Sequence, residues 1–193
     1  MPILKTAVVV ALLALLAGGG AAAQHKPSDT PVQFSATVQA TGPLGSIATT
    51  VQIHITQYTE ERDRQALLAA LVKNGYQTFL PALRKVPTVG YVQIKEQKWI
   101  LKWAHQQTSD KGQTVTVATD QPIFFVGGGS ANEKPRAGYE MAIIRLEVDG
   151  IGMGKGTMAA PARVKPAGDG QGVVVDDYAD KPLPITMVSR IFS

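Results

Sequence analysis

Apolar and polar residues alternate from residue 32 onward, the pattern of a half-buried β-strand. The apolar positions of this first alternating segment are Val32, Phe34, Ala36, Val38 and Ala40. Residues 42–45 (GPLG) suit a turn, and the alternation resumes at Val51, Ile53 and Ile55. The two segments predict an antiparallel hairpin.

The apolar spacing changes to that of a helix over about residues 59–86. An apolar stripe at helical spacing contains Leu67, Leu68, Leu71 and Val72. Thr59 suits the N-cap of this helix, and Asn74 and Gly75 suit its C-terminal end. A second, shorter helix is expected to run to Lys85. The segment predicts a helical hairpin.

Short apolar segments separated by turn residues make up the rest of the chain. We expect strands at residues 89–94, 99–106, 115–119, 140–148, 158–164, 173–175 and 185–192. Alternating β-α-β units are absent, so a parallel sheet is not expected. The predicted fold class is α+β and mainly β: an antiparallel β-sandwich or barrel with an inserted helical hairpin. The pattern does not decide between sandwich and barrel.

The glycine-rich stretch at residues 150–156 does not match a phosphate-binding loop. A Walker loop requires Ser or Thr after Lys155, where Gly156 stands, and glycine in place of Asp149. In an extended strand, Gly150, Gly152, Gly154 and Gly156 would form a bare strip on one face. Such a strip lets another backbone approach closely, and we favour this packing role.

The N-terminus has the three parts of a secretory signal peptide. Lys5 supplies the positive charge, residues 7–17 form an apolar core, and residues 21–23 are small alanines. The apolar core is shorter than the ~20 residues of a spanning helix. We therefore expect a signal peptide at residues 1–23, and no transmembrane segment after its cleavage.

The chain contains no cysteine. Disulfides, thiolate metal sites, a cysteine nucleophile and lipidation through cysteine are therefore excluded. Together with the signal peptide, this indicates an exported protein, periplasmic or secreted, of bacterial type. Residues 24–193 are enough for a single β-rich domain.

The formal net charge of +4 is spread along the chain. Nucleic-acid binders usually concentrate basic residues on one face, so no nucleic-acid partner is expected. The three histidines lie far apart in sequence and have no carboxylates at metal-ligand spacing. No catalytic, cofactor-binding or metal-binding residue is predicted.

The aromatic residues around 91–105 form the candidate ligand-binding set. Both tryptophans of the chain, Trp99 and Trp103, lie four residues apart. On a strand they would share a face with Leu101 and His105, and Tyr91 lies on the preceding strand. We predict Tyr91, Trp99, Trp103 and His105 as ligand-binding residues, because aromatic side chains favour pockets. The alternative is that they are ordinary core residues.

Several short runs resemble a group of uncharacterised exported bacterial proteins, a domain of unknown function. The runs are residues 58–62, 67–75, 83–87, 89–91 and 118–123. They cover about a third of the chain. The resemblance implies export and a bacterial source, and it implies no activity.

The leading hypothesis is a non-enzymatic exported β-domain that binds a small or apolar ligand, or an envelope partner protein. One alternative is an envelope hydrolase whose site is assembled only by the fold, with His54, His105 and Asp120 as first candidates. Another is a structural assembly subunit whose exposed strand edges pair with a partner.

Overall fold

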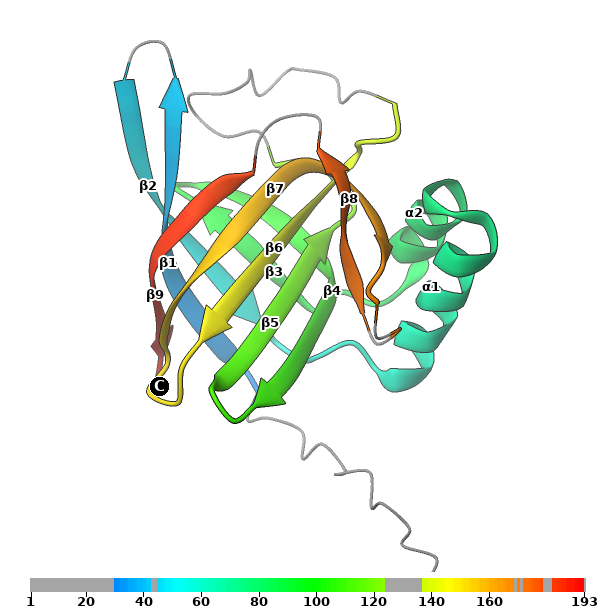
Figure 1. Ribbon diagram of the computed structural model, residues 1–193, viewed down its shortest axis with the longest axis horizontal. Coiled ribbons are helices and arrows are strands. Elements are labelled where there is room, and N and C mark those ends of the chain that lie inside the picture. The colour runs from blue at the N-terminus through cyan, green and yellow to red at the C-terminus, as the bar shows by residue number, and fades with distance from the viewer. Residues whose placement is uncertain are drawn as a thin grey trace, which may run out of the picture.

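The structure is a computed structural model and describes residues 30–42, 45–123, 137–168, 170, 172–178 and 182–192. The expected signal peptide, residues 1–23, lies outside the described residues. Within them the chain forms nine strands and two helices (Figure 1). The elements are β1 (Val32–Gly42), β2 (Gly45–Ile55), α1 (Glu61–Asn74), α2 (Tyr76–Lys85), β3 (Gly90–Ile94), β4 (Gln97–Ser109), β5 (Gly112–Thr119), β6 (Met141–Val148), β7 (Met153–Pro166), β8 (Val173–Tyr178) and β9 (Leu183–Ile191).

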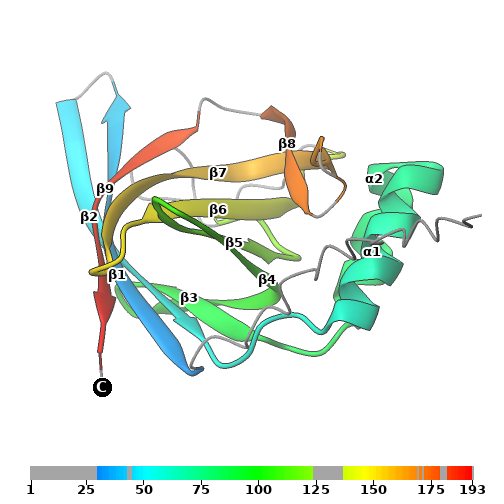
Figure 2. The ribbon, with the colours of Figure 1, turned by 60° about the horizontal axis from the view of Figure 1, so that its bottom comes forward.

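Eight of these strands close into an antiparallel barrel, which decides between the two predicted architectures. The order around the barrel is β6-β5-β4-β3-β2-β1-β9-β7, and β7 returns to pair with β6. β8 pairs with the second half of β7, outside the barrel (Figure 2). The α+β, mainly β prediction with an inserted helical hairpin is confirmed.

The first predicted hairpin is confirmed and supplies one wall of the barrel. β1 and β2 pair without interruption from Val32 opposite Ile55 to Gly42 opposite Gly45. Their alternating apolar side chains point into the barrel, where Phe34 and Ile53 are fully buried. The other strands contribute further aliphatic side chains to this interior, among them Val92, Leu101, Val117, Ile144, Leu146, Met158 and Val188.

The glycines of β7 allow close contact between β7 and β6. A Cβ atom on Gly154 would collide with the carbonyl oxygen of Glu147, and one on Gly156 with that of Arg145. The packing role is therefore correct for these two glycines. Gly150 and Gly152 precede β7, in the β6–β7 turn, so the predicted strip is shorter than expected.

The helical hairpin packs outside the barrel, as Figures 1 and 2 show. Gly75 ends α1 as expected, and its N–H donates to Leu71 O at 2.8 Å. The expected cap at Thr59 is wrong, since Glu60 occupies the N-cap position. The Thr59 hydroxyl instead accepts a hydrogen bond from the Ala104 N–H at 2.9 Å, which joins the start of the helical segment to β4.

A second apolar cluster fills the space between the helices and the barrel wall. Its helical members include Leu67, Leu71, Phe79 and Leu83. The barrel wall contributes the outward side chains Trp103, Ala118, Ile143 and Ala159, and Val173 of β8 also joins. The molecule therefore has an inner cluster within the barrel and an outer cluster beneath the helices.

Candidate functional site

The structure does not bring the four predicted aromatic-site residues together. Tyr91 lies on the outer face of β3, where its ring stacks on that of His54 with centroids 5.0 Å apart. The Lys98 Nζ atom lies 4.5 Å from the centroid of the same ring. These contacts form a small surface cluster of their own.

Trp99 and Trp103 lie on opposite faces of β4. The half-buried Trp99 packs against the inner cluster, whereas Trp103 is fully buried in the outer cluster. The cause is a β-bulge, because β4 advances from Leu101 to Trp103 while β5 advances by one residue. The expectation that Trp99, Leu101, Trp103 and His105 share a face is therefore wrong. Of the four predicted site residues, Trp103 and His105 are the pair that remains together.

Trp103 and His105 form the start of the site that the structure does assemble. Their rings meet edge to face, with centroids 6.3 Å apart. The Trp103 side chain is fully enclosed, and its indole N–H has no hydrogen-bond acceptor within the described part of the chain. An enclosed donor without an acceptor costs about 1–3 kcal/mol, so such a group calls for a role.

His105 begins a row of polar side chains that crosses four strands of the barrel wall. It lies opposite Thr116 of β5, which lies opposite Arg145 of β6, which in turn lies opposite Thr157 of β7. Adjacent strands are ~4.8 Å apart, so neighbouring members of the row can contact one ligand together. The row offers an imidazole, a guanidinium and two hydroxyls.

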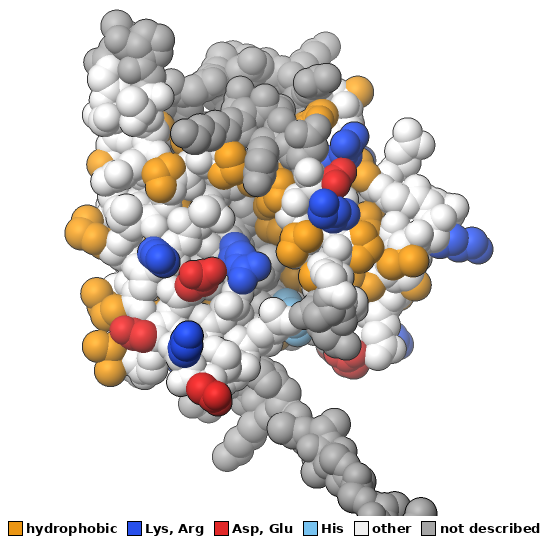
Figure 3. Space-filling view, viewed as in Figure 1, with side chains coloured by type: hydrophobic (Ala, Val, Ile, Leu, Met, Phe, Trp, Pro, Cys, Tyr) orange, Lys and Arg blue, Asp and Glu red, His pale blue; other side chains and the backbone are white. Residues whose placement is uncertain are grey.

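β8 and the β7–β8 connection form the opposite wall of a groove over this row. Two adjoining hollows of about 300 Å³ and 250 Å³ share Thr116, Arg145, Val173 and Val174. We call the combined space the β8 groove. Its lining comprises Trp103, His105, Gln107, Thr116, Ile143, Arg145, Thr157, Ala159, Ala167, Gly168, Gly172, Val173, Val174, Val175 and Pro182. Figure 3 shows hydrophobic side chains gathered where β8 lies near the helical hairpin.

Arg145 is the cation of the groove. Its guanidinium lies 3.7 Å from Glu147 Oε1, and about half of each side chain is exposed. An exposed pair at this distance is weak, so the guanidinium can turn toward an anionic group in the groove at little cost. Arg145 can therefore serve as an anion-binding residue.

An acidic residue of α1, Glu61, interacts electrostatically with His105 without lining the groove itself. Arg64 donates to both carboxylate oxygens of Glu61, at 2.9 and 2.6 Å. This hydrogen bonding from Arg64 lowers the pKa of Glu61 against the opposing effect of burial, and a hydrogen bond from Gln65 and the electrostatic interaction with His105 add smaller contributions. A ligand anion therefore has a more favourable environment at Arg145 than at the end near Glu61.

The groove residues on β5, β6, β7 and β8 were not predicted from the sequence. Alternation along β6 points the Arg145 side chain to the outer face, away from the buried Ile144 and Leu146. That signal marks Arg145 as outward-facing, but it does not reveal that His105 lies two strands away. The register between non-adjacent segments determines this, and no local pattern encodes it.

The residues considered for a hydrolase do not form a common site. His54 of β2 lies opposite Tyr91 of β3, which lies opposite Ile100 of β4. His105 lies five residues beyond Ile100, so roughly 16 Å along the strand direction separates it from His54. Asp120 follows β5 four residues beyond Thr116, which is the partner of His105, so roughly 13 Å separates them. Three groups at such separations cannot act on one bond.

The described residues contain neither a cluster of metal-binding side chains nor a helix suited to span a membrane. No group of three or more His, Cys, Asp or Glu side chains lies close enough together there to hold a metal ion. No described helix combines the length and the apolar character needed to cross a membrane.

Comparison of the chain with protein-family models, with curated proteins and with solved structures found no match. The site must therefore be interpreted from its own geometry.

Proposed function

We propose that the protein is a non-enzymatic binding module that holds a small ligand in the β8 groove. The observation that carries the proposal is the enclosed indole N–H of Trp103, which has no acceptor among the described residues and lies at a groove that also contains Arg145. Because the Trp103 side chain has no exposed surface, the groups that cover it must move before an acceptor on a ligand can reach the N–H. That acceptor would then satisfy the donor and fix the ligand by a polar contact within an apolar wall.

The lining indicates the chemical class of the ligand. Val173, Val174 and Ile143 offer an apolar surface, while Arg145 and the threonine hydroxyls offer hydrogen bonds. The two hollows, of about 300 Å³ and 250 Å³, suit a small molecule rather than a folded partner. The best fit is a small carboxylate with an aliphatic or aromatic body.

Export is part of the same proposal. The signal-like N-terminus and the absence of cysteine support a module that works beyond the bacterial inner membrane, in the periplasm or outside the cell. A free-standing binder in that location would capture or carry small organic acids.

Intrinsic fluorescence tests the proposal, because the chain has two tryptophans. The Trp99→Phe variant leaves Trp103 as the single reporter. We expect hexanoate, benzoate or naphthoate to shift or quench its emission saturably and to raise the melting temperature. Tyr91→Ala, which changes the separate surface cluster, is the matched control and should leave the response intact. If none of the three compounds changes emission or melting temperature, the proposal fails.

A further inference from the structure

The distal half of the β1–β2 hairpin extends beyond the rest of the barrel (Figure 1). β9 pairs with β1 only between Gln33 and Val38, and β3 pairs with β2 only between Val51 and Ile55. Within the described part of the chain, the stretch Gly45–Thr50 therefore pairs with β1 alone. No described strand pairs with its other side, and we call this stretch the free β2 edge.

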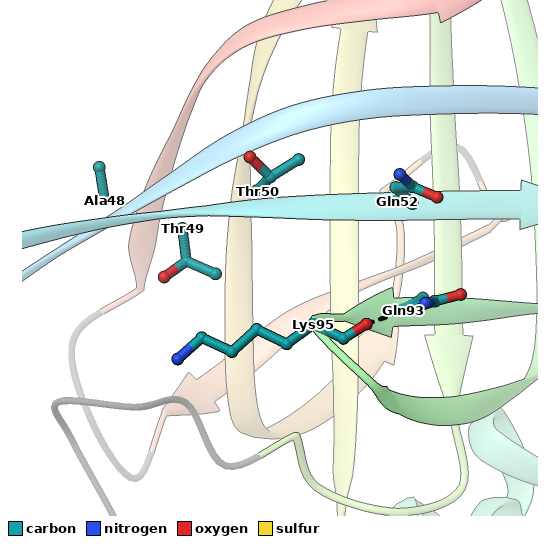
Figure 4. A pocket seen from close by; sticks show the side chains of 6 residues that line it. All are labelled: Ala48, Thr49, Thr50, Gln52, Gln93 and Lys95. Atoms are coloured by element: carbon teal, nitrogen blue, oxygen red, sulfur yellow. Dashed lines mark hydrogen bonds between the residues drawn. The ribbon is translucent and has the colours of Figure 1, made fainter.

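A hollow lies beside the free β2 edge, where β3 ends. Its volume is about 370 Å³, and Ala48, Thr49, Thr50, Gln52, Gln93 and Lys95 line it. Figure 4 shows the Lys95 side chain extending from the end of β3 along β2, on the side to which Thr49 points. A strand that continued the line of β3 would occupy this space.

The composition of the free β2 edge favours pairing with another strand. An open edge exposes unpaired N–H and C=O groups, and proteins commonly protect it with charged residues, proline or a bulge. Gly45–Thr50 contains no charged residue and no proline, and its register with β1 is continuous. Ile47 is 43% exposed within it. Among the described residues that line the hollow, Lys95 is the one that carries a charge.

We propose that the free β2 edge pairs antiparallel with the same edge of a second copy of this chain. The open stretch is bounded by the hairpin turn at one end and by β3 at the other. A second copy brings a stretch of the same length with the same boundaries, so a twofold axis at Ala48 fills both hollows at once. No charge in the stretch opposes this pairing.

The twofold axis fixes which side chains meet. Ala48 lies opposite Ala48 of the partner subunit, and Ile47 lies opposite Thr49 of the partner subunit. The second pair joins two β-branched side chains, which is a favourable cross-strand combination. The contact is short compared with the ~1,200–2,000 Å² of stable complexes, so association is weak and depends on concentration.

Like charges at the axis provide the decisive test. Ala48 is exposed, so Ala48→Lys and Ala48→Glu leave the monomer intact while placing equal charges opposite each other. Sedimentation velocity of protein expressed from the full coding sequence should show a mass between monomer and dimer that rises over about a hundredfold range of concentration. Each variant alone should associate about fivefold more weakly.

An equimolar mixture of Ala48→Lys and Ala48→Glu should associate at least as tightly as the wild type, because opposite charges then meet. Ala69→Lys adds the same charge at an exposed alanine of α1, which neither belongs to the free β2 edge nor lines the hollow, and it should behave as the wild type. Amide hydrogen exchange in Gly45–Thr50 should slow as the concentration rises, which gives a readout that needs no variant.

Three outcomes would overturn the proposal. The first is a wild type that stays monomeric with concentration-independent exchange in Gly45–Thr50. The second is a mixture that associates no better than either variant alone. The third is an Ala69→Lys variant that associates as weakly as Ala48→Lys, because the loss would then not depend on charge at the free β2 edge.

Discussion

The inner cluster of the barrel and the outer cluster beneath the helices are both built from apolar side chains, but different elements enclose them. The inner cluster is closed by eight strands and filled by side chains such as Phe34, Ile53 and Leu146. The outer cluster is bounded by separate elements and opens into the β8 groove. Its margin contains an enclosed indole N–H without an acceptor among the described residues, on Trp103.

This difference links the inner cluster to the stability of the fold and the outer cluster to the expected binding of a ligand. A closed sheet satisfies its own backbone hydrogen bonds and needs nothing beyond apolar filling. The outer cluster lies where a barrel wall, a helical hairpin and β8 meet without full complementarity, so space and unpaired polar groups remain at their junction. The expected ligand site therefore lies outside the barrel rather than within it.

The largest expected effect comes from the inner cluster. Phe34→Ala removes a fully buried ring from the closed barrel, and we expect a loss of about 4 kcal/mol of unfolding free energy. Phe79→Ala removes an equally buried ring from α2 in the outer cluster. Hydrogen exchange should show that Phe34→Ala weakens all strands, whereas Phe79→Ala weakens the helices first. Equal protection loss in both regions would remove the distinction between the two clusters.

The next effect tests how tightly the barrel is closed at β7. Gly154→Ala would drive a Cβ atom into the backbone carbonyl of Glu147, so we expect a loss of about 3 kcal/mol in urea unfolding. A Cβ atom on Gly150 would meet no atom within 4 Å, which makes Gly150→Ala the matched control with a change below about 0.5 kcal/mol. Similar losses at both glycines would argue against close β6–β7 contact.

A smaller effect concerns the buried hydroxyl of the outer cluster. The Tyr76 hydroxyl accepts a hydrogen bond from the Glu140 N–H at 3.0 Å, and burial raises its pKa well above the usual 10.0. Because the folded pKa is raised, its contribution to stability is complete below pH 10.0 and is lost as the pH rises further.

Tyr76→Phe should therefore cost about 1 kcal/mol at neutral pH, from the unpaired Glu140 N–H, and should reduce the alkaline loss of stability. Urea titrations of wild type and variant between pH 8 and pH 11 would measure this, pH values being chosen to bracket the usual pKa of 10.0. Parallel alkaline curves for the two proteins would show that Tyr76 is not the responsible group.

The smallest stability effect and the clearest binding effect are expected at the groove. Arg145→Ala removes a weak, exposed ion pair, so thermal unfolding should change by less than about 0.5 kcal/mol. Affinity for benzoate should fall about tenfold, because a charge-assisted hydrogen bond is lost. Arg62→Ala, which removes an exposed ion pair with Asp63 on α1 outside the groove, is the matched control. Unchanged benzoate affinity in Arg145→Ala would remove the guanidinium from the site.

Local sequence patterns predicted the strands and helices but not the way that they meet. Alternation along residues 32–55 determines the β1–β2 hairpin, because each residue's face follows from its neighbours. Barrel closure depends on β9 pairing with both β1 and β7 and on β6 pairing with β7. Most of these pairings join segments distant in sequence, so the pattern left sandwich and barrel equally open.

The candidate site was predicted in part, and a single inserted residue in β4 explains why Trp99 and Trp103 do not share a face. In a regular strand, Trp99 and Trp103 would point to the same face of β4. The bulge near Lys102 places them on opposite faces. A bulge of this kind leaves no mark in the alternation of one strand, because it is defined by the partner strand. Trp103 and His105 lie beyond the bulge and were correctly grouped with each other.

The most direct test of the ligand site is the indole N–H resonance of Trp103 in the Trp99→Phe variant, followed by NMR during titration with benzoate. Because this N–H is enclosed and has no acceptor in the described structure, the account predicts a saturable downfield shift as the carboxylate accepts it. A resonance that stays in place while benzoate saturates the protein would contradict a ligand site in the β8 groove.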